Sequence, residues 1–232
     1  FTETNYTGTL GLAQQATVED GIIPGNLYLG YNHDLQQDLH ILGDLFVTGG
    51  TFDLTDFNLI IDGNSIFSGG TIKINGQTVI SHGEVTLTST QLRLEGGTFE
   101  AKSHFTTGNS YGMIIMTDAS DYLLIHGNFQ TQTLNELTNG TLELKGNFTQ
   151  LRNTQFWAGR PTFKATDDHQ VILSSDLEQV ISFQDPLDSY FNHLEIKNTE
   201  NVHFTNQAYV RGHLKFTETN YTGTLGLAQQ AT

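Results

Sequence analysis

Residues 43–54 read GDLFVTGGTFDL, and residues 63–74 read GNSIFSGGTIKI. In both stretches a Gly-polar pair opens a run of alternating apolar and polar residues, which Gly-Gly-Thr interrupts before the alternation resumes. Alternation over about four to six residues is typical of a β-strand, because successive side chains point to opposite faces. Gly and Asn tolerate positive φ and favour tight turns. These stretches therefore predict short strands joined by sharp corners.

The same punctuation recurs along the chain at nearly regular intervals. The Gly-polar pair stands at Gly43, Gly63, Gly83, Gly127 and Gly146, and a Gly-Gly-Thr or Asn-Gly-Thr motif stands at Gly49, Gly69, Gly96 and Asn139. Short strands, tight turns and a short fixed period are typical of a β-solenoid. We therefore expect an all-β parallel β-helix with three short strands and about 20 residues per coil. Roughly eleven coils would make a unit about 50 Å long.

The regular punctuation thins from Leu151 to Gln207, although strand-like segments persist there. This pattern predicts coils with longer loops in the later part of the chain.

One segment of the chain occurs twice. Residues 1–17 read FTETNYTGTLGLAQQAT, and residues 216–232 repeat them without a difference. Residues 1–215 are therefore interpreted as one solenoid unit, and residues 216–232 as the start of the next identical unit. One explanation is an overlap cut from a longer tandem array, and the other is a periodic object such as a filament. The boundary lies in the alternating segment HLKFTET, which favours the periodic object.

The two ends of a solenoid expose unpaired backbone groups, which ordinary β-helices cover with capping elements. No polar cap is recognisable here, and the end of the unit continues into the sequence that opens the next. A head-to-tail contact of this kind is heterologous and generates open fibres. We expect Leu10, Leu12, Leu225 and Leu227 to lie in the assembly seam. Copies joined covalently and separate chains joined by strand addition are both compatible with the sequence.

Composition excludes several classes of function. The chain carries 10 Lys and Arg against 25 Asp and Glu, a formal net charge of -15, so it lacks the basic face that nucleic acids and anionic membranes require. The same charge would keep long rods apart in solution. There are no cysteines, which excludes disulfides and thiolate metal sites. No apolar run is long enough to predict membrane insertion.

Two groups of acidic residues are candidates for chemistry. Asp167 and Asp168, followed by His169, are the pair that a carbohydrate-active enzyme on this fold would use, but the stretch reads better as a turn before the strand at Val171. Asp53, Asp56 and Asp62 could approach one another around calcium, but their spacing matches no known calcium loop and favours a solvated acidic face. We expect no catalytic residues, no cofactor and no metal, and therefore a protein that is not an enzyme.

Aromatic residues in the less regular stretches are candidates for stacking on sugars. They are Trp157, beside Phe156, together with Tyr111 and Tyr190. Exposed aromatics in loops would suit a glycan-binding module, and packing of these loops onto the solenoid is the alternative.

Several segments resemble a repeat of very large secreted or surface proteins of Gram-positive bacteria. They read DYLLIHGNF (121–129), TNGTLELKGNFTQ (138–150), HQVIL (169–173), QVISF (179–183) and FNHLEIK (191–197), and the resemblance runs from Leu39 to Lys215. More distantly, the rhythm of the coils is similar to filamentous-haemagglutinin-type β-helices. The resemblance implies a right-handed β-helix, tandem repetition, and an adhesive or scaffolding role outside the bacterial cell or on its surface.

The sequence therefore predicts a structural subunit or tandem repeat of an extracellular bacterial fibre or long surface adhesin. Its expected partners are identical copies of itself, stacked head to tail, and cell-surface or host glycans are a further expectation. The alternative hypotheses are a polysaccharide lyase or hydrolase and a glycan-binding module on the same fold.

Overall fold

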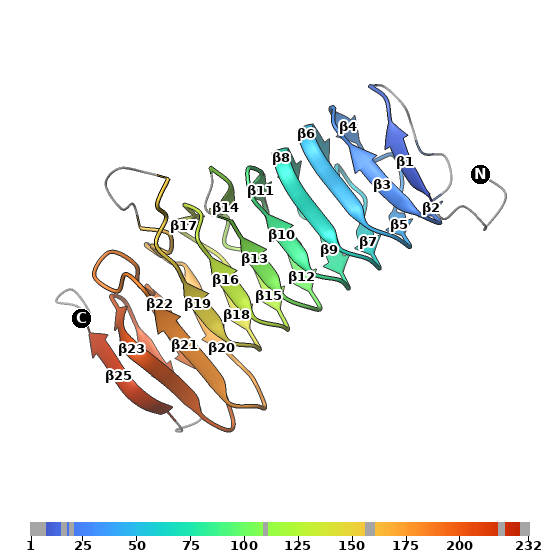
Figure 1. Cartoon of the computed structure of the whole chain (residues 1–232). Coiled ribbons are helices and arrows are strands. Elements are labelled where there is room, and N and C mark those ends of the chain that lie inside the picture. Colours follow the sequence, from blue (N-terminus) through green and yellow to red (C-terminus); the bar gives the residue numbers. More distant parts are fainter. Residues whose placement is uncertain are drawn as a thin grey trace.

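The computed structural model describes residues 8–14, 18, 21–108, 111–155, 161–217 and 221–227. Every regular element in these residues is a β-strand, and the strands coil into a rod (Figure 1). No membrane-spanning helix is found among them. The strands are β1 (Thr9–Leu12), β2 (Ile22–Ile23), β3 (Asn26–Leu29), β4 (His33–Asp34), β5 (Leu39–Ile41), β6 (Leu45–Asp53), β7 (Leu59–Ile61), β8 (Ser65–Lys73), β9 (Thr78–Ser81), β10 (Val85–Leu87), β11 (Gln91–Arg93), β12 (Thr98–Ala101), β13 (Phe105–Thr107), β14 (Met113–Met116), β15 (Tyr122–Ile125), β16 (Phe129–Thr131), β17 (Glu136–Leu137), β18 (Thr141–Leu144), β19 (Phe148–Gln150), β20 (Gln170–Leu173), β21 (Gln179–Phe183), β22 (His193–Ile196), β23 (Val202–Val210), β24 (Leu214–Phe216) and β25 (Tyr221–Leu227).

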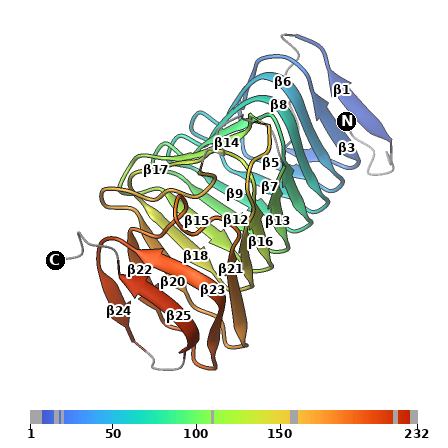
Figure 2. The same ribbon diagram turned by 60° about the vertical axis from the view of Figure 1, so that its left-hand side comes forward.

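The rod has three faces of parallel strands (Figure 2). The first two faces belong to one 15-stranded sheet, and the third is a 10-stranded sheet. The first face runs in the order β1-β3-β6-β8-β10-β13-β16-β19-β21-β23-β25, and the third runs β2-β5-β7-β9-β12-β15-β18-β20-β22-β24. The second face contains β4, the later halves of β6 and β8, β11, β14 and β17. Isolated bridges then carry it on to β23. One coil, such as β10 with β11 and β12, contributes a short strand to each face.

These observations confirm the all-β solenoid with three short strands and about 20 residues per coil. The eleven strands of the first face make ten steps from β1 to β25, not eleven coils. At about 4.8 Å per step the rise over one unit is about 48 Å.

Inward-pointing side chains form continuous columns along the rod. On the first face the column contains Leu27, Leu45, Ser65, Val85, Phe105, Phe129, Phe148, Ile181 and Phe204. Phe148 is fully buried and its ring contacts Phe129, Phe163, Phe183 and Phe191 at centroid distances of 5.0 to 5.9 Å. Burying one side chain of this size is worth about 1.5–3 kcal/mol, so the columns supply most of the stabilisation.

The Gly-polar pair forms the corner between the third and first faces. A Cβ on Gly83 would lie 2.4 Å from the carbonyl oxygen of Gly63 in the coil beneath, so only glycine fits. The polar residue that follows builds a ladder. The Oδ1 of Asp44 accepts a hydrogen bond from the backbone N–H of Asn64, and the Oδ1 of Asn64 accepts one from Glu84. The side chain thus satisfies a corner N–H that sheet pairing leaves free.

The structure separates the Gly-Gly-Thr motif into two different corners. Gly49 and Gly69 lie inside β6 and β8, where the chain turns from the first face to the second. Gly96 and Asn139 lie instead between the second face and the third, after β11 and β17. The same residue types recur because both corners need tight backbone turns, so the motif is not one structural position.

The later coils are longer, as the thinning of the Gly punctuation predicts. Phe148 and Ile181 stack in adjacent coils of the first face, although the sequence between them is much longer than that from Phe129 to Phe148. The extra residues form irregular segments between β19 and β20 and around residues 184–189.

Candidate assembly surface

Exposed large apolar side chains gather near the two ends of the rod. Ile22, Tyr28, Tyr31 and Leu42 lie in the first coils, and Phe216, Tyr221 and Leu227 lie in the last. Tyr111, Leu177 and Leu187 are exposed in loops. The described residues from 43 to 108 contain no exposed large apolar side chain. Exposed apolar residues that cluster in this way mark surfaces made for contact.

The N-terminal end is the strand β1. It pairs with β3 in parallel, so that Leu10 stacks on Leu27 and Leu12 on Leu29. Both leucines are half-buried against the core. The other edge of β1 has no partner strand among the described residues.

The C-terminal end is the strand β25, which pairs with β23 in parallel along both the first and second faces. Leu225 stacks on Ala208 and packs against the core, whereas Leu227 stacks on Val210 and is 62% exposed. The ring of Phe216 stacks on that of Tyr221 with centroids 5.3 Å apart. Among the described residues, β25 is the last strand of the sheet at this end.

Both ends carry the same four residues, TLGL, at positions 9–12 and 224–227. The first copy opens the eleven-strand order of the first face and the second copy closes it, with the same strand direction. The structure thus places all four predicted seam leucines at the two sheet edges. It does not place the two copies equivalently, because Leu10 lies on the first face and Leu225 on the second.

Gly223 lies at the corner where the placement of the second copy departs from that of the first. It pairs with Phe204 in the inward column of the first face. In the N-terminal copy, the residue in this column is Leu10, which comes two residues after the equivalent glycine, Gly8. Its φ is +96°, and a Cβ there would lie 2.2 Å from the carbonyl oxygen of Phe204. Glycine therefore lets the chain turn the corner early and carries the leucines onto the second face.

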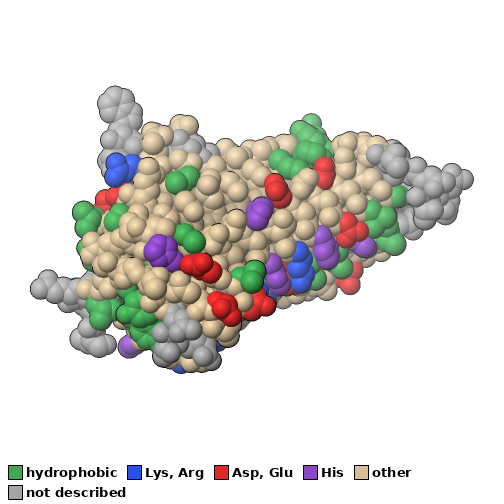
Figure 3. Space-filling view, turned by 60° about the horizontal axis from the view of Figure 1, so that its bottom comes forward, with side chains coloured by type: hydrophobic (Ala, Val, Ile, Leu, Met, Phe, Trp, Pro, Cys, Tyr) green, Lys and Arg blue, Asp and Glu red, His purple; other side chains and the backbone are tan. Residues whose placement is uncertain are grey.

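The outward side of the third face carries a ladder of carboxylates that sequence reasoning missed. Glu100 accepts from Lys102 at 2.5 Å and from His126 at 2.7 Å. Burial alone would raise the pKa of this carboxyl, but these hydrogen bonds and charges outweigh burial and lower it below its usual value. Figure 3 shows His, Lys and acidic side chains alternating along one edge of the rod. The ladder could be found only by aligning coils at the correct register.

Glu143 and Glu195 continue the ladder in later coils. Glu143 accepts from Tyr122 at 2.5 Å and from Ser174 at 2.6 Å, and Glu195 accepts from Lys215 at 2.7 Å. Burial opposes ionisation of both carboxyls, yet their hydrogen bonds keep both pKa values lowered. Burial, and then the hydrogen bond to Glu143, raises the pKa of Tyr122. The carboxylates are engaged with neighbouring coils, so their evident action is to hold the stack together.

The pair Asp167 and Asp168 lies in a tight turn, and β20 begins directly after His169, as predicted. His169 is fully buried, and its Nδ1 lies 2.7 Å from the carbonyl oxygen of Asn139. Burial lowers the pKa of this imidazole to about 4. The histidine is a neutral part of the corner and is closed to a substrate.

The three aspartates considered for calcium lie on different faces. Asp53 lies on the second face with Lys73 and accepts a hydrogen bond from Asn75, whereas Asp62 lies beside His40 on the third face at 3.0 Å. Asp56 is exposed in the turn between β6 and β7. Within the described ranges, no three His, Asp or Glu residues are grouped as metal ligands.

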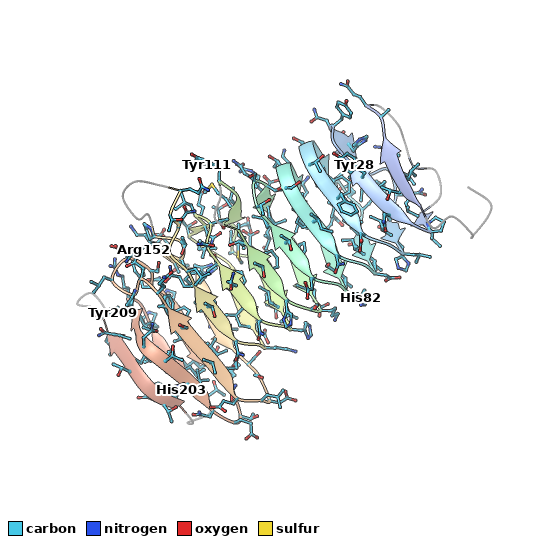
Figure 4. The ribbon with its side chains drawn as sticks, in the orientation of Figure 1. Tyr28, His82, Tyr111, Arg152, His203 and Tyr209 are labelled. Carbon is cyan, nitrogen blue, oxygen red and sulfur yellow. The ribbon has the colours of Figure 1, made fainter. Side chains whose placement is uncertain are left out.

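The aromatic candidates for sugar stacking differ in how exposed they are to solvent. Tyr111 is 68% exposed at the outer edge of the coil that contains β14 (Figure 4). Tyr190 is only 3% exposed, and the guanidinium carbon of Arg211 lies 3.5 Å from its ring centroid. The ring of Tyr190 is therefore covered and closed to a sugar, which corrects that expectation. Trp157 lies outside the described residues.

Comparison with known proteins leaves the fold as the principal guide to function. No family model, no curated protein and no solved structure matches this chain.

Proposed function

We propose that this chain is a structural unit of an extracellular bacterial fibre or long surface adhesin, which stacks head to tail through its two solenoid ends. One observation carries the proposal: the same TLGL strand occupies both terminal edges of one continuous parallel sheet. A strand that belongs to the end of one unit and to the start of the next joins two solenoids without a break.

The direction of the strands supports this arrangement. Because β1 and β25 run parallel to their partners, the last edge of one unit meets the first edge of the next in the orientation that the sheet requires. The contact joins two different surfaces, so it does not close on itself and generates an open rod. The inward leucines of the seam are only partly covered within one unit, with Leu227 62% exposed, so their burial between two units drives association.

The resemblance to repeats of Gram-positive surface proteins supports the extracellular location and the tandem arrangement. The absence of cysteine and the acidic charge are compatible with a long surface rod, since like charges keep neighbouring rods separate. Tandem copies in one polypeptide and separate chains joined at the seam both give an open rod.

Electron microscopy of the purified chain tests the proposal. We expect thin, unbranched rods. Separate chains, each with eleven strands on the first face, should repeat about every 53 Å, whereas tandem copies that share the junction strand should repeat about every 48 Å. Leu10→Asp combined with Leu225→Asp places charges in the seam and should abolish rods. Leu177→Asp, at a loop position that is 70% exposed, is the matched control and should leave rods intact. Compact single particles from the unaltered chain, at every concentration, would refute the proposal.

A further inference from the structure

A cavity opens at the N-terminal end of the core, between the first coil and the second. Residues of the first two coils line it, among them Leu12, Val18, His33, Leu35 and Leu39. His33 is 7% exposed, and its Nε2 has no hydrogen-bond partner among the described residues. A buried polar atom without a partner costs about 1–3 kcal/mol, so this end of the core is incomplete as it stands.

The cavity lies where two inward columns of the second face begin. His33 stacks on Phe52, which stacks on Ile72, and Leu35 follows two residues after His33 and so begins the neighbouring column. At the far end of the rod, the second face finishes with Leu225 on Ala208 and with Leu227 on Val210.

The strand pairings along the second face show that the residues at its two ends belong to the same columns. The column of His33 passes through Ile72, Leu92 and Ile114 and reaches Ala208 and Leu225. The column of Leu35 reaches Phe191, Val210 and Leu227 in the same way. Each column therefore ends on a leucine at one end of the unit and opens on the cavity at the other.

At the N-terminal end the repeated leucines do not cover these columns. Leu10 and Leu12 cover Leu27 and Leu29 on the first face, and among the described residues of the first coil Leu12 and Val18 line the cavity. We propose that the cavity over His33 and Leu35 is the socket for Leu225 and Leu227 of the preceding unit. The shared strand then takes the register of β25 and not that of β1. The inference rests on the proposed head-to-tail assembly and specifies its register.

Coil lengths favour the register of β25. In that register Gly223 stacks on Phe204, and the equivalent Gly8 of the next unit would lie beneath Leu27. The coil from Phe204 to Gly223 and the coil from Gly8 to Leu27 then have the same number of residues. The regular coils that follow, from Leu27 to Leu45 and on to Ser65, have similar lengths. In the register of β1, the coil from Leu10 to Leu27 is shorter than any of these coils. The coil before it, which would run from Phe204 to Leu225 and not to Gly223, becomes two residues longer.

The glycine itself is a second argument. A side chain at position 223 would collide with the carbonyl oxygen of Phe204, so the register of β25 requires glycine there. The register of β1 places Leu10 at this position of the first face and so requires no glycine there. The repeated sequence supplies a glycine where the proposed register needs one.

Engineered disulfides distinguish the two registers, and the chain has no cysteine to interfere. The test protein is a two-unit chain, residues 1–215 followed directly by residues 1–232, in which one strand is shared at the junction. In this chain, Leu12 of the second unit occupies the junction position that Leu227 has in the single chain. Leu12→Cys of the second unit is paired with Leu35→Cys of the same unit, which the proposed register stacks. The competing pair joins Leu12→Cys to Leu29→Cys, which the register of β1 stacks. Stacked positions in adjacent coils are about 4.8 Å apart, within the range for a disulfide.

Under mild oxidation we expect the Leu35 pair to form the disulfide, read by mass spectrometry of the linked peptides, and the Leu29 pair to remain reduced. Leu29→Cys with Val47→Cys inside one unit is the positive control, because these residues stack in the structure. A disulfide only in the Leu29 pair, in a chain whose scattering shows one continuous rod, overturns the register and leaves the proposed function standing. Two separate solenoids with neither disulfide overturn both.

Separate chains give a second measurement that does not depend on folding of the two-unit chain. Leu227→Cys chains are mixed with Leu35→Cys chains and oxidised, and the product is read on a non-reducing gel. We expect a disulfide-linked dimer from this mixture and none from Leu227→Cys mixed with Leu12→Cys, because Leu12 covers Leu29 at the first-face edge of a separate chain. The reverse result contradicts the socket.

Discussion

At the scale of single residues, the solenoid depends on positions where only one type of side chain fits. The corner glycines are the clearest case, because each lies directly against the backbone of the coil beneath it. Gly83 has the carbonyl oxygen of Gly63 where a Cβ would lie, and Gly63 has the same relation to Gly43. The polar residues after Gly43 and Gly63, Asp44 and Asn64, each accept a hydrogen bond from a backbone N–H of the next coil. A corner therefore combines a steric requirement with a hydrogen-bonding one.

Gly83→Ala should destabilise the protein by about 1–3 kcal/mol, because the added methyl group forces two coils apart. The free energy of unfolding, measured by urea titration with circular dichroism, checks this value. Gly11→Ala is the control, since a Cβ there meets nothing within 4 Å, and its effect should stay within about 0.5 kcal/mol. Equal effects of the two changes would contradict the close corner packing.

His169 should make stability depend on pH. Burial lowers its folded-state pKa to about 4, whereas the unfolded chain has a value near 6.5. The unfolded state therefore binds a proton that the folded state refuses, so stability is complete above about pH 6.5 and falls as the pH drops toward 4.

His169→Asn keeps a donor for the Asn139 carbonyl and removes this titration. The loss of unfolding free energy between pH 7 and 4.5 should then be smaller than in the parent, by about 2 kcal/mol. His82→Asn, at an exposed position, serves as the control. An unchanged pH profile in His169→Asn would show that the imidazole is not buried as described.

At the scale of strands and coils, the phenylalanine rings tie successive coils together. Phe148 contacts rings from the coil before it and from the coil after it, and no part of it is exposed. These contacts lie where the coils become long and the corner punctuation thins. Aromatic packing there takes over the role that regular corners have in the earlier coils.

Phe148→Ala should cost about 3–5 kcal/mol, since it removes a fully buried ring and leaves a cavity that neighbouring rings cannot fill. Phe46→Ala, at an outward and partly exposed position of β6, is the matched control and should cost much less. Urea unfolding of both variants measures the difference. Similar costs would mean that the stacked rings contribute little beyond ordinary burial.

Much of this architecture follows from the sequence, because period and corner chemistry are local. The Gly-polar pair at Gly63 and the alternation after it place a corner and a strand without any knowledge of the fold. The two corners that share the Gly-Gly-Thr motif could not be separated, since both need the same backbone freedom. The prediction of an open Tyr190 is wrong because Arg211, from the next coil, covers its ring. The register of the seam also depends on which face a leucine reaches, a property of three dimensions.

At the scale of the whole molecule, the negative charge opposes contact between rods side by side, whereas the apolar ends favour contact end to end. The net charge of -15 is spread over a rod, whereas exposed apolar side chains are concentrated near its two ends. Association through the ends is thereby favoured over association through the sides. The shape and the charge together specify growth along one axis.

Salt should change the lateral behaviour of assembled rods. At about 10 mM salt the screening length is about 30 Å and rods should stay separate, whereas at about 1 M it falls to about 3 Å and rods should gather side by side. Small-angle X-ray scattering over a salt series measures the transition. Bundles of the same size at both salt concentrations would show that charge does not control lateral contact.

The longest coil, which leads from Phe148 to Ile181, has a consequence for the assembled rod. Its irregular segments occur once per unit, so head-to-tail stacking would present one set about every 48 Å. A weak ligand for such a segment would meet the next copy at a high effective concentration before it diffuses away. Avidity would then grow with the number of units joined, and the length of the polymer would set the strength of attachment.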